Sequence, residues 1–231
     1  MKAAPTISAS RDAARLPEDA TARTRILDAA EEFFSEYGFD GTSLRQIALR
    51  AGVPAGLIGY HFTGKLGLYC ALFESRTPSI VEQRNIGLAL AELEDDPDRR
   101  LELILKAVLV PMLRMTSQDS GSRFGLLLAR EVSDPRSSER GIVEKMLDPI
   151  AVAVTDQLRT LLPKHSEAEI HWAYHTIVGA MTYMMLDSGR IVRLSKGAAD
   201  PRNVDAMIRH LTALLLKCLQ GPPALLKDTS S

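Results

Sequence analysis

Apolar residues recur at helical spacing along almost the whole chain, and this periodicity limits the fold more than any other feature of the sequence. From Thr21 onward they lie three and four positions apart, the spacing that places side chains on one face of an α-helix. Beyond Pro78 no run alternates between apolar and polar residues as a strand would. The sequence therefore predicts an all-α protein. The apolar stripe of the first helix consists of Ile26, Leu27, Ala30, Phe33, Phe34 and Tyr37.

Capping and turn residues indicate where these helices begin and end. Gly38 provides a left-handed stop for the first helix, and Thr42 can cap the second. Pro78 should end the fourth, because proline interrupts helical hydrogen bonding. The expected helices span residues 21–38, 43–51, 54–62, 65–77, 79–94, 98–116, 122–133, 138–162, 167–187 and 201–219.

Later helix boundaries rest on a few residues. Pro111 and Pro149 fall inside expected helices and should kink them. Asp200 precedes Pro201, and proline suits the first position of the last helix. The run SEAE at residues 166–169 is a capping box, in which the serine caps the amide of the second glutamate and that glutamate reaches back.

The chain divides into four parts. Residues 1–19 are rich in alanine, serine, proline and charge, with little to bury, so we expect a flexible arm. Residues 20–77 hold the first four helices, and residues 78–220 hold the larger helical part. A chain of 231 residues is long enough to bury a core in such an arrangement. Residues 221–231 begin with GPP and are expected to form a flexible tail.

Charge and cysteine content exclude several classes of protein. The net charge of -1 gives no overall field that favours or opposes nucleic acid, so any basic surface must be local. Cys70 and Cys218 lack the spacing of a disulfide scaffold or a zinc site. The N-terminus has no apolar run typical of a signal peptide, and no stretch of about eighteen apolar residues could span a membrane. We therefore expect a soluble cytoplasmic protein with no membrane contact.

A local basic surface is expected at residues 41–76. This segment contains four basic residues and one acidic residue, whereas residues 1–40 contain five basic and eight acidic residues. The short helix 43–51, the turn at Gly52 and the helix from Pro54 have the lengths of a helix-turn-helix, whose second helix enters the major groove of DNA. These residues predict a DNA-binding unit in the first part of the chain.

Linked motifs in this region resemble the N-terminal domain of the tetracycline-repressor (TetR) family. LIGYHF at residues 57–62 resembles the LIxYHF form of one branch of that family, and GLLLAREVSDP at residues 125–135 resembles the start of a C-terminal domain in one branch. The resemblance implies a homodimeric, ligand-responsive transcriptional regulator, by default a repressor, with two recognition helices on a palindromic operator. The linked motifs are RILDAA at 25–30, FFSEYGFDGTSLRQIA at 33–48, AGV at 51–53, and then Gly56, Tyr60, His61, Phe62 and Lys65.

The resemblance also implies which residues contact DNA. Arg45 matches a position that often reads a guanine edge, for which a guanidinium fork is suited. Phosphate contacts, which set position rather than sequence preference, are expected at the starts of the second and fourth helices and from Tyr60 and His61. Gln46 can contact a base or face solvent, and Leu57 can contact DNA or pack. The expected DNA-binding residues are Thr42, Ser43, Arg45, Gln46, Pro54, Ala55, Gly56, Leu57, Tyr60, His61 and Lys65.

The chain departs from the family pattern at three positions. Gly59 stands where much of the family has a tyrosine, Pro54 where a serine often caps the recognition helix, and Leu66 where an acidic residue is common. Gly59 removes one phosphate contact and Pro54 removes one amide donor. A ligand-binding or scaffold dimer that has lost DNA recognition therefore stays open as an alternative.

The larger helical part carries no recognisable catalytic constellation. His171 and His175 lie four apart, but no acidic or cysteine ligand is spaced with them as a metallohydrolase requires. We therefore expect no enzyme, metal or cofactor. The family resemblance implies a pocket for an effector, and we expect an apolar or amphipathic one, with Arg130, Glu131 and His175 as possible polar anchors. The candidate pocket residues, for which core packing is the alternative, are Met112, Met115, Phe124, Leu128, Trp172, His175 and Met181.

Dimerisation is implied for the helices at 138–162 and 167–187, packed with their copies as a four-helix bundle as in the family. Each carries an apolar stripe, and one such face suffices for the core of a single chain. The stripes are Val143, Met146, Leu147, Ile150, Val154, Leu158 and Leu161 on one helix, and Ile170, Ala173, Ile177, Val178, Met181 and Met185 on the other.

Overall fold

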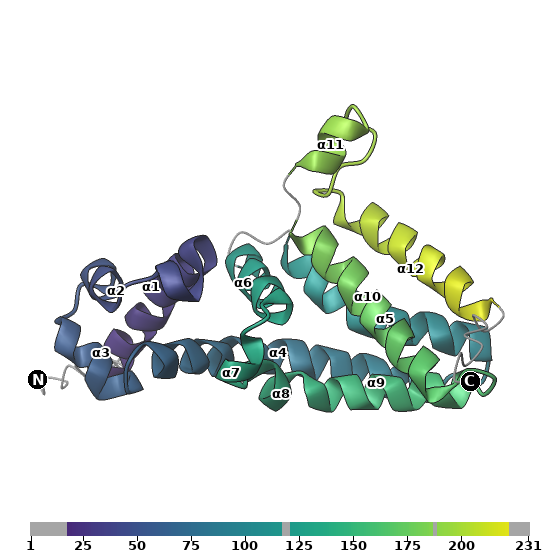
Figure 1. Cartoon of the computed structure of the whole chain (residues 1–231), viewed down its shortest axis with the longest axis horizontal. Coiled ribbons are helices and arrows are strands. Elements are labelled where there is room, and N and C mark those ends of the chain that lie inside the picture. The colour runs from purple at the N-terminus through teal and green to yellow at the C-terminus, as the bar shows by residue number, and fades with distance from the viewer. Residues whose placement is uncertain (1–17, 117–120, 187–188, 222–231) are drawn as a thin grey trace, which may run out of the picture.

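Helices dominate the structure, a computed structural model that describes residues 18–116, 121–186 and 189–221 (Figure 1). These ranges contain no strand, so the all-α prediction is confirmed. The expected arm and tail lie almost wholly outside the described residues. The helices are α1 (Glu18–Gly41), α2 (Leu44–Ala51), α3 (Ala55–Phe62), α4 (Lys65–Glu92), α5 (Pro97–Met115), α6 (Gly121–Ser133), α7 (Ser137–Arg140), α8 (Ile142–Met146), α9 (Asp148–Leu161), α10 (Glu167–Met185), α11 (Arg190–Leu194) and α12 (Val204–Gln220).

Helices α1, α2 and α3 gather at one end of the molecule, and α4 runs from them along the rest of the chain (Figure 1). The helical path of α1 is interrupted at Gly38, where φ is 72° and ψ is 179°. α2 ends at Gly52 in the left-handed conformation, which glycine adopts without steric cost. Both glycine stops agree with the sequence prediction. The small core of this end includes Ile26, Ala30, Phe34, Ile47, Ile58, Phe62 and Leu68.

α4 continues through Pro78 as one helix of 28 residues. The predicted helix end at Pro78 and the separate helix at 79–94 are therefore wrong. A proline removes only its own hydrogen-bond donor, and the burial of Phe73 and Ile80 on either side of it offsets this loss. The expected boundary between residues 77 and 78 lies inside α4, so this helix is shared by both parts of the chain.

The predicted single helix at 138–162 is also wrong, because three helices, α7, α8 and α9, occupy this range. Gly141 adopts the left-handed conformation between α7 and α8, with φ 63° and ψ 18°. Pro149 sits in the first turn of α9, where its missing N–H has no helical partner to lose. Proline thus starts a helix here instead of kinking one. Pro111 lies inside α5, as expected.

The last helix begins at Val204, not at Pro201. Its cap is Asn203, whose side chain accepts the amide of Ala206 at 3.1 Å. α11, a short helix at Arg190–Leu194, has no counterpart in the sequence prediction. The capping box at the start of α10 is confirmed, because both of its reciprocal hydrogen bonds are present.

The larger part of the molecule is built around α5, which packs between α4 and α12 and also contacts α9 and α10. α4 and α5 approach closely at Gly87, where a Cβ would lie 2.7 Å from the Cβ of Ala107. α6 packs against α1 and so joins the two parts of the chain. Among the described helices, none has the length and apolar composition needed to cross a membrane.

Candidate DNA-binding surface

The N-terminus of α2 is capped by Ser43. Its backbone is extended, and its Oγ accepts the amide of Arg45 at 3.2 Å. Thr42 is buried, and its hydroxyl lies 2.8 Å from the carbonyl oxygen of Gly38 and 3.1 Å from that of Phe33. The predicted cap at Thr42 is therefore wrong. The Thr42 hydroxyl points toward α1, so a phosphate contact from it, which stays a prediction, would require the hydroxyl to leave these carbonyls.

α2 and α3 each bury one face and expose the other. α2 buries Ile47 and Ala48, and α3 buries Ile58 and Phe62. Leu57 is half-buried, so packing accounts for part of its surface. The other face of the two helices is open to solvent. The expected DNA-binding residues on this exposed face are Ser43, Arg45, Gln46, Pro54, Ala55, Gly56 and Tyr60.

Gly56 and Gly59 leave bare backbone on the exposed face of α3. A Cβ on either residue would meet no heavy atom within 4 Å, so the packing of the described chain does not require glycine there. Gly67 differs, because its Cβ would lie 1.7 Å from the carbonyl oxygen of Phe62. Glycine inside a helix costs about 1 kcal/mol relative to alanine. The two exposed glycines therefore suit close approach by a partner outside the chain.

Tyr60 and His61 occupy different environments, although phosphate contacts are expected from both. The Tyr60 side chain is 76% exposed. His61 is half-buried, with its ring centroid 5.1 Å from that of Tyr60 and 5.8 Å from that of Phe62. Its Nε2 is buried and has no hydrogen-bond partner among the described residues. A phosphate contact from His61 in this arrangement would have to use Nδ1.

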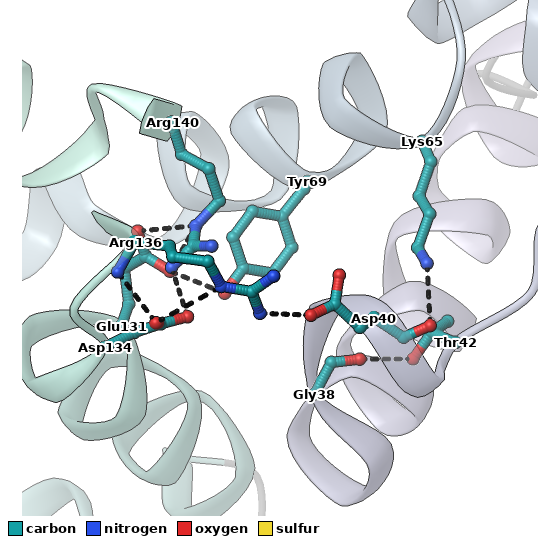
Figure 2. A network of polar contacts seen from close by, with 9 residues as sticks. All are labelled: Gly38, Asp40, Thr42, Lys65, Tyr69, Glu131, Asp134, Arg136 and Arg140. Atoms are coloured by element: carbon teal, nitrogen blue, oxygen red, sulfur yellow. Dashed lines mark hydrogen bonds and ion pairs between the residues drawn. The ribbon is translucent and has the colours of Figure 1, made fainter. Parts of the chain in front are cut away.

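The side chain of Lys65, the first residue of α4, lies against the end of α1 (Figure 2). Its Nζ donates to the carbonyl oxygen of Asp40 at 3.2 Å and lies 4.8 Å from the centroid of the Phe39 ring. Gly64, just before it, has φ 98°, which supplies the predicted turn. A phosphate contact by Lys65 stays a prediction, and it would require the ammonium to share or leave the Asp40 carbonyl.

Salt bridges occupy acidic residues of α1, and of the two exposed arginines of α2 they engage Arg50 and not Arg45. Arg50 pairs with Glu32 at 3.0 Å, and Arg76 pairs with Asp28 at 2.6 Å. Arg45 is exposed and has no carboxylate within 4 Å among the described residues. The exposed face of α2 therefore presents a cation suited to a DNA partner.

A buried ionic network lies where α4, α6 and α7 meet, close to the end of α1 (Figure 2). Glu131 is 1% exposed, and its carboxylate accepts bonds from the hydroxyl of Tyr69 and the guanidinium of Arg140, each at 3.0 Å. Arg140 also bonds Asp134 at 2.6 Å. Burial and the Glu131 carboxylate raise the pKa of Tyr69. The sequence signal for this network is the place of Glu131 on the apolar stripe of α6, four residues after Leu127.

Two arginines next to this network reach across to α1. Arg136 forms an ion pair with Asp40 (Figure 2). Arg130 donates to the backbone carbonyl of Ser35. Arg130 and Glu131, which the sequence suggests as polar anchors for an effector, join α6 to its neighbours, and both also line a cavity of about 310 Å³ beside this network.

A cavity of about 620 Å³ opens between α1, α4, α5 and α6. Two of the predicted pocket residues, Met115 and Phe124, line it. Trp172 is 63% exposed on α10, and His175 is exposed on the same helix, so the pocket prediction is wrong for these two. The remaining predicted pocket residues, which are buried in the core, are Met112, Leu128 and Met181.

The apolar stripes predicted for dimerisation mostly face inward. Ile150 of α9 and Ile177 of α10, for example, are buried within the single chain. The outward faces of the same two helices carry Val152, Trp172 and Tyr183, which are 58%, 63% and 70% exposed. On α9 and α10, the large apolar side chains that are exposed are therefore these three and not those of the predicted stripes.

Comparison with known proteins places both parts of the chain in one family. Residues 26–72 match the family described as "Bacterial regulatory proteins, tetR family". Residues 106–216 match the family described as "Tetracyclin repressor-like, C-terminal domain". The two matches together cover the helix-turn-helix and most of the larger helical part.

Individual relatives are transcriptional regulators. The chain is 32% identical over 125 residues to each of the regulators SrpR and TtgW, both from Pseudomonas putida. The matched region makes up 54% of this chain. It covers about half (52%) of SrpR and 82% of TtgW. The chain is 28% identical over 189 residues to the repressor Rv1474c from Mycobacterium tuberculosis, covering 82% of the chain and 90% of that protein.

The fold resembles solved structures of the same family. One is a TetR-like transcriptional regulator from Rhodococcus sp. RHA1, which superimposes with a TM-score of 0.60 at 22% identity. The superposition covers 90% of this chain and all of that one. This likeness supports the fold, namely a helix-turn-helix end joined to a larger helical part.

Proposed function

Because this chain belongs to the TetR family of helix-turn-helix transcriptional regulators, we propose that it is a homodimeric repressor. We propose further that it binds a palindromic DNA operator and leaves it when an apolar or amphipathic small molecule binds. Rv1474c is named a repressor and FasR from Mycolicibacterium smegmatis an activator, and both are 28% identical to this chain. Repression is therefore the family default that we propose, and activation would use the same parts.

The observation that carries the proposal is the bare backbone at Gly56 and Gly59 on the exposed face of α3. Nothing in the described chain fills the space beside these residues, and each lowers the stability of a short helix. Such a surface suits a helix that lies in the major groove, where a small side chain lets the backbone approach the base edges closely. We therefore assign α3 as the recognition helix, in the branch with the LIxYHF form.

The proposed contacts divide into reading and positioning. Arg45 is exposed and suited to a guanine edge, while Ser43 and Tyr60 are exposed and suited to phosphates. Lys65 is a further phosphate contact once its ammonium turns from the Asp40 carbonyl. Pro54 and Gly59 offer no polar side chain, which places more of the sequence preference on Arg45 and on DNA shape.

We propose that two chains associate through the outward faces of α9 and α10. Two recognition helices on one face of a duplex must lie about 34 to 36 Å apart, one helical turn of DNA. A ligand that binds better to a form with another spacing weakens DNA binding by the same coupling factor. α4 is the element suited to transmit this change, because it runs unbroken from Lys65 into the larger helical part.

Footprinting on DNA upstream of the gene for this protein tests the proposal. A protected palindrome at low salt is the expected result, with protection lost as salt rises because phosphate contacts release counterions. The Arg45→Ala variant serves as the matched control and should protect the site more weakly. Absence of any protected palindrome at low salt would favour the alternative, a ligand-binding dimer without DNA recognition.

A further inference from the structure

Arg84 of α4 is a buried arginine with no charged partner among the residues that the structure describes. It is 5% exposed and lies between α5 and α10, where Nη2 donates to the carbonyl oxygen of Val108 at 3.3 Å and lies 3.9 Å from Sδ of Met181. Its Nε has no hydrogen-bond partner among the described residues. The guanidinium has five N–H donors in a planar fork, and the Nε–H donor is unused here.

No carboxylate lies within 4 Å of the Arg84 guanidinium in the described parts of the chain. The buried Glu131 differs, because Arg140 pairs with it at 2.9 Å. Burial lowers the pKa of Arg84, and the nearby Tyr174 opposes this shift only in part. A buried cation without a counter-charge opposes folding, so a partner that supplies the negative charge is the expected explanation for an arginine at this place.

The cavity between α1, α4, α5 and α6 extends to within one helical turn of Arg84. Its lining includes Ile80 on α4 and Pro111 on α5. Ile80 precedes Arg84 by four residues on the same face of α4, and Pro111 follows Val108 by three on the same face of α5. Arg84, Val108 and Met181 do not themselves line the cavity, so a group that pairs with the guanidinium has to enter between α4 and α5 beyond Ile80 and Pro111.

The wall of the cavity combines apolar surface with charged side chains of both signs. Met115 and Phe124 contribute apolar surface, and the flexible thioether of a methionine adapts to ligands of irregular shape. The other lining side chains include three arginines and two carboxylates, so the lining carries more positive than negative charge. Arg76 pairs with the carboxylates of Asp28 and Glu31, and Arg114 pairs with Asp205 at 3.5 Å. The cationic groups would raise the local concentration of an anionic ligand. These arginines are Arg76, Arg114 and Arg123.

We propose that the effector is an apolar molecule with one carboxylate or phosphate group, which pairs with Arg84 while the apolar body occupies the cavity. The thioether of Met181 is the weak partner that the oxyanion would displace, since an ionised acceptor forms stronger bonds with a guanidinium than sulfur does. The inference rests on the proposed function only in assuming that the protein binds an effector.

The test uses the full-length protein and matched pairs of probes. Hexanoate, octanoate, decanoate and dodecanoate are compared with the alcohols of the same chain length and with octyl phosphate, by isothermal titration and by thermal shift. At least one carboxylate or the phosphate should bind at least tenfold more tightly than its alcohol. Tighter binding of octyl phosphate than of octanoate would identify phosphate as the head group. Tighter binding of octanoate would identify a carboxylate.

Variants of Arg84 decide whether this residue is responsible. Arg84→Met keeps the length of the side chain and should abolish the preference for the anion, whereas Arg84→Lys should keep part of it. Arg209→Met, at an exposed arginine of α12, is the control and should bind as the unmodified protein does. Without ligand, Arg84→Met should unfold at the same or a higher temperature, because an uncompensated charge has been removed.

Two results would overturn the inference: no anion binding better than its alcohol, or Arg84→Met retaining the full preference. A large fall in the unfolding temperature of Arg84→Met would also contradict it, because a purely structural role requires that fall. Failure of the proposed function looks different. If anions bind through Arg84 but no DNA palindrome is protected, the effector site at Arg84 is supported and the proposed repressor function is rejected.

Discussion

The hydroxyl of Tyr69 in α4 donates to Oε2 of Glu131 in α6 at 3.0 Å, across a separation of 62 residues in sequence. Arg140 bonds the same carboxylate, and Arg136 next to it pairs with Asp40 of α1 (Figure 2). The network thus lies between the helix-turn-helix end and the larger helical part. It ties the orientation of the first helices to the position of α6.

Replacement of Glu131 should be more damaging than replacement of its hydroxyl partner. Glu131→Gln leaves the buried Arg140 with Asp134 as its remaining carboxylate, and should lower the free energy of unfolding by about 3 kcal/mol. Tyr69→Phe removes one hydrogen bond and should cost about 1 kcal/mol. Urea unfolding followed by circular dichroism measures both. Equal costs for the two variants would show that the Arg140 pair contributes little to stability.

Alanine at the exposed glycines of α3 should separate stability from DNA binding. Gly56→Ala and Gly59→Ala should each stabilise the protein by about 0.5 to 1 kcal/mol, because the added Cβ meets no neighbour and alanine favours helix. Both should weaken operator binding, because the methyl group stands where the groove approaches. Gly67→Ala is the control and should destabilise, since its Cβ would overlap the Phe62 carbonyl. Unchanged DNA affinity of the first two variants would move the recognition surface elsewhere.

Arg45 and Lys65 should differ in how their loss affects DNA binding. Arg45→Ala should cost about 1 to 3 kcal/mol and relax the preference at one base pair in each half-site. Lys65→Ala should weaken binding to all sequences alike. It should also reduce the slope of the logarithm of the binding constant against the logarithm of salt concentration by about one. Fluorescence anisotropy with operator variants over a range of salt concentrations measures both effects. A uniform loss with Arg45→Ala would reject its assignment as the base reader.

The proposed dimer surface predicts an effect of charge at Trp172 and Tyr183. Glutamate at either position should shift the protein toward monomer in sedimentation equilibrium, because a charge would be buried against the second chain. Leu93→Glu, at an exposed apolar residue that follows α4, is the control and should leave the oligomeric state unchanged. Trp172 is the single tryptophan, so its emission should also shift to the red on dilution. A constant emission spectrum and an unchanged mass would place the interface elsewhere.

The ion pair between Arg159 and Glu167 predicts a dependence of stability on pH. Hydrogen bonds from Arg159 hold the pKa of Glu167 at about 2, below its usual 4.5. Since the folded pKa lies below the unfolded one, this carboxylate stabilises the fold above pH 4.5, and the stabilisation is lost as pH falls toward 2.

Thermal unfolding at several pH values measures this dependence. Glu167→Gln should unfold at a lower temperature than the unmodified protein above pH 4.5, and the difference should vanish near pH 2. Glu144→Gln, at an exposed acidic residue of α8, controls for the loss of a negative charge. A difference that persists near pH 2 would mean that Glu167 stabilises the fold by something other than its charge.

Local signals were sufficient for much of the helix-turn-helix. Gly52 ends α2 and Gly64 turns the chain before α4, because both adopt positive φ that other residues rarely adopt. The capping box at Ser166 is equally local, since its partners lie three residues apart. These features depend on residues close in sequence, so a pattern along the chain is enough to predict them.

Local signals failed where packing opposed them. Pro78 predicts a helix end from its sequence, but α4 continues through it because residues on both sides of the proline are buried. Threonine and serine are both good N-cap residues, but Ser43 caps α2 because the Thr42 hydroxyl is bonded to carbonyls of α1. Trp172 looks like a pocket residue by composition, but the rotation of α10 places it outside.

The sequence by itself determined the fold class, the position of the helix-turn-helix and the family, because each rests on short-range periodicity or on linked motifs. Only the tertiary structure decided that Glu131 joins Tyr69 and Arg140, and that Arg84 is buried without a carboxylate partner among the described residues. Those facts depend on which helices pack side by side over separations of many residues. Burial makes an unpaired charge costly, so the packed helices, and not the local sequence, make Arg84 the residue that most needs an anionic partner.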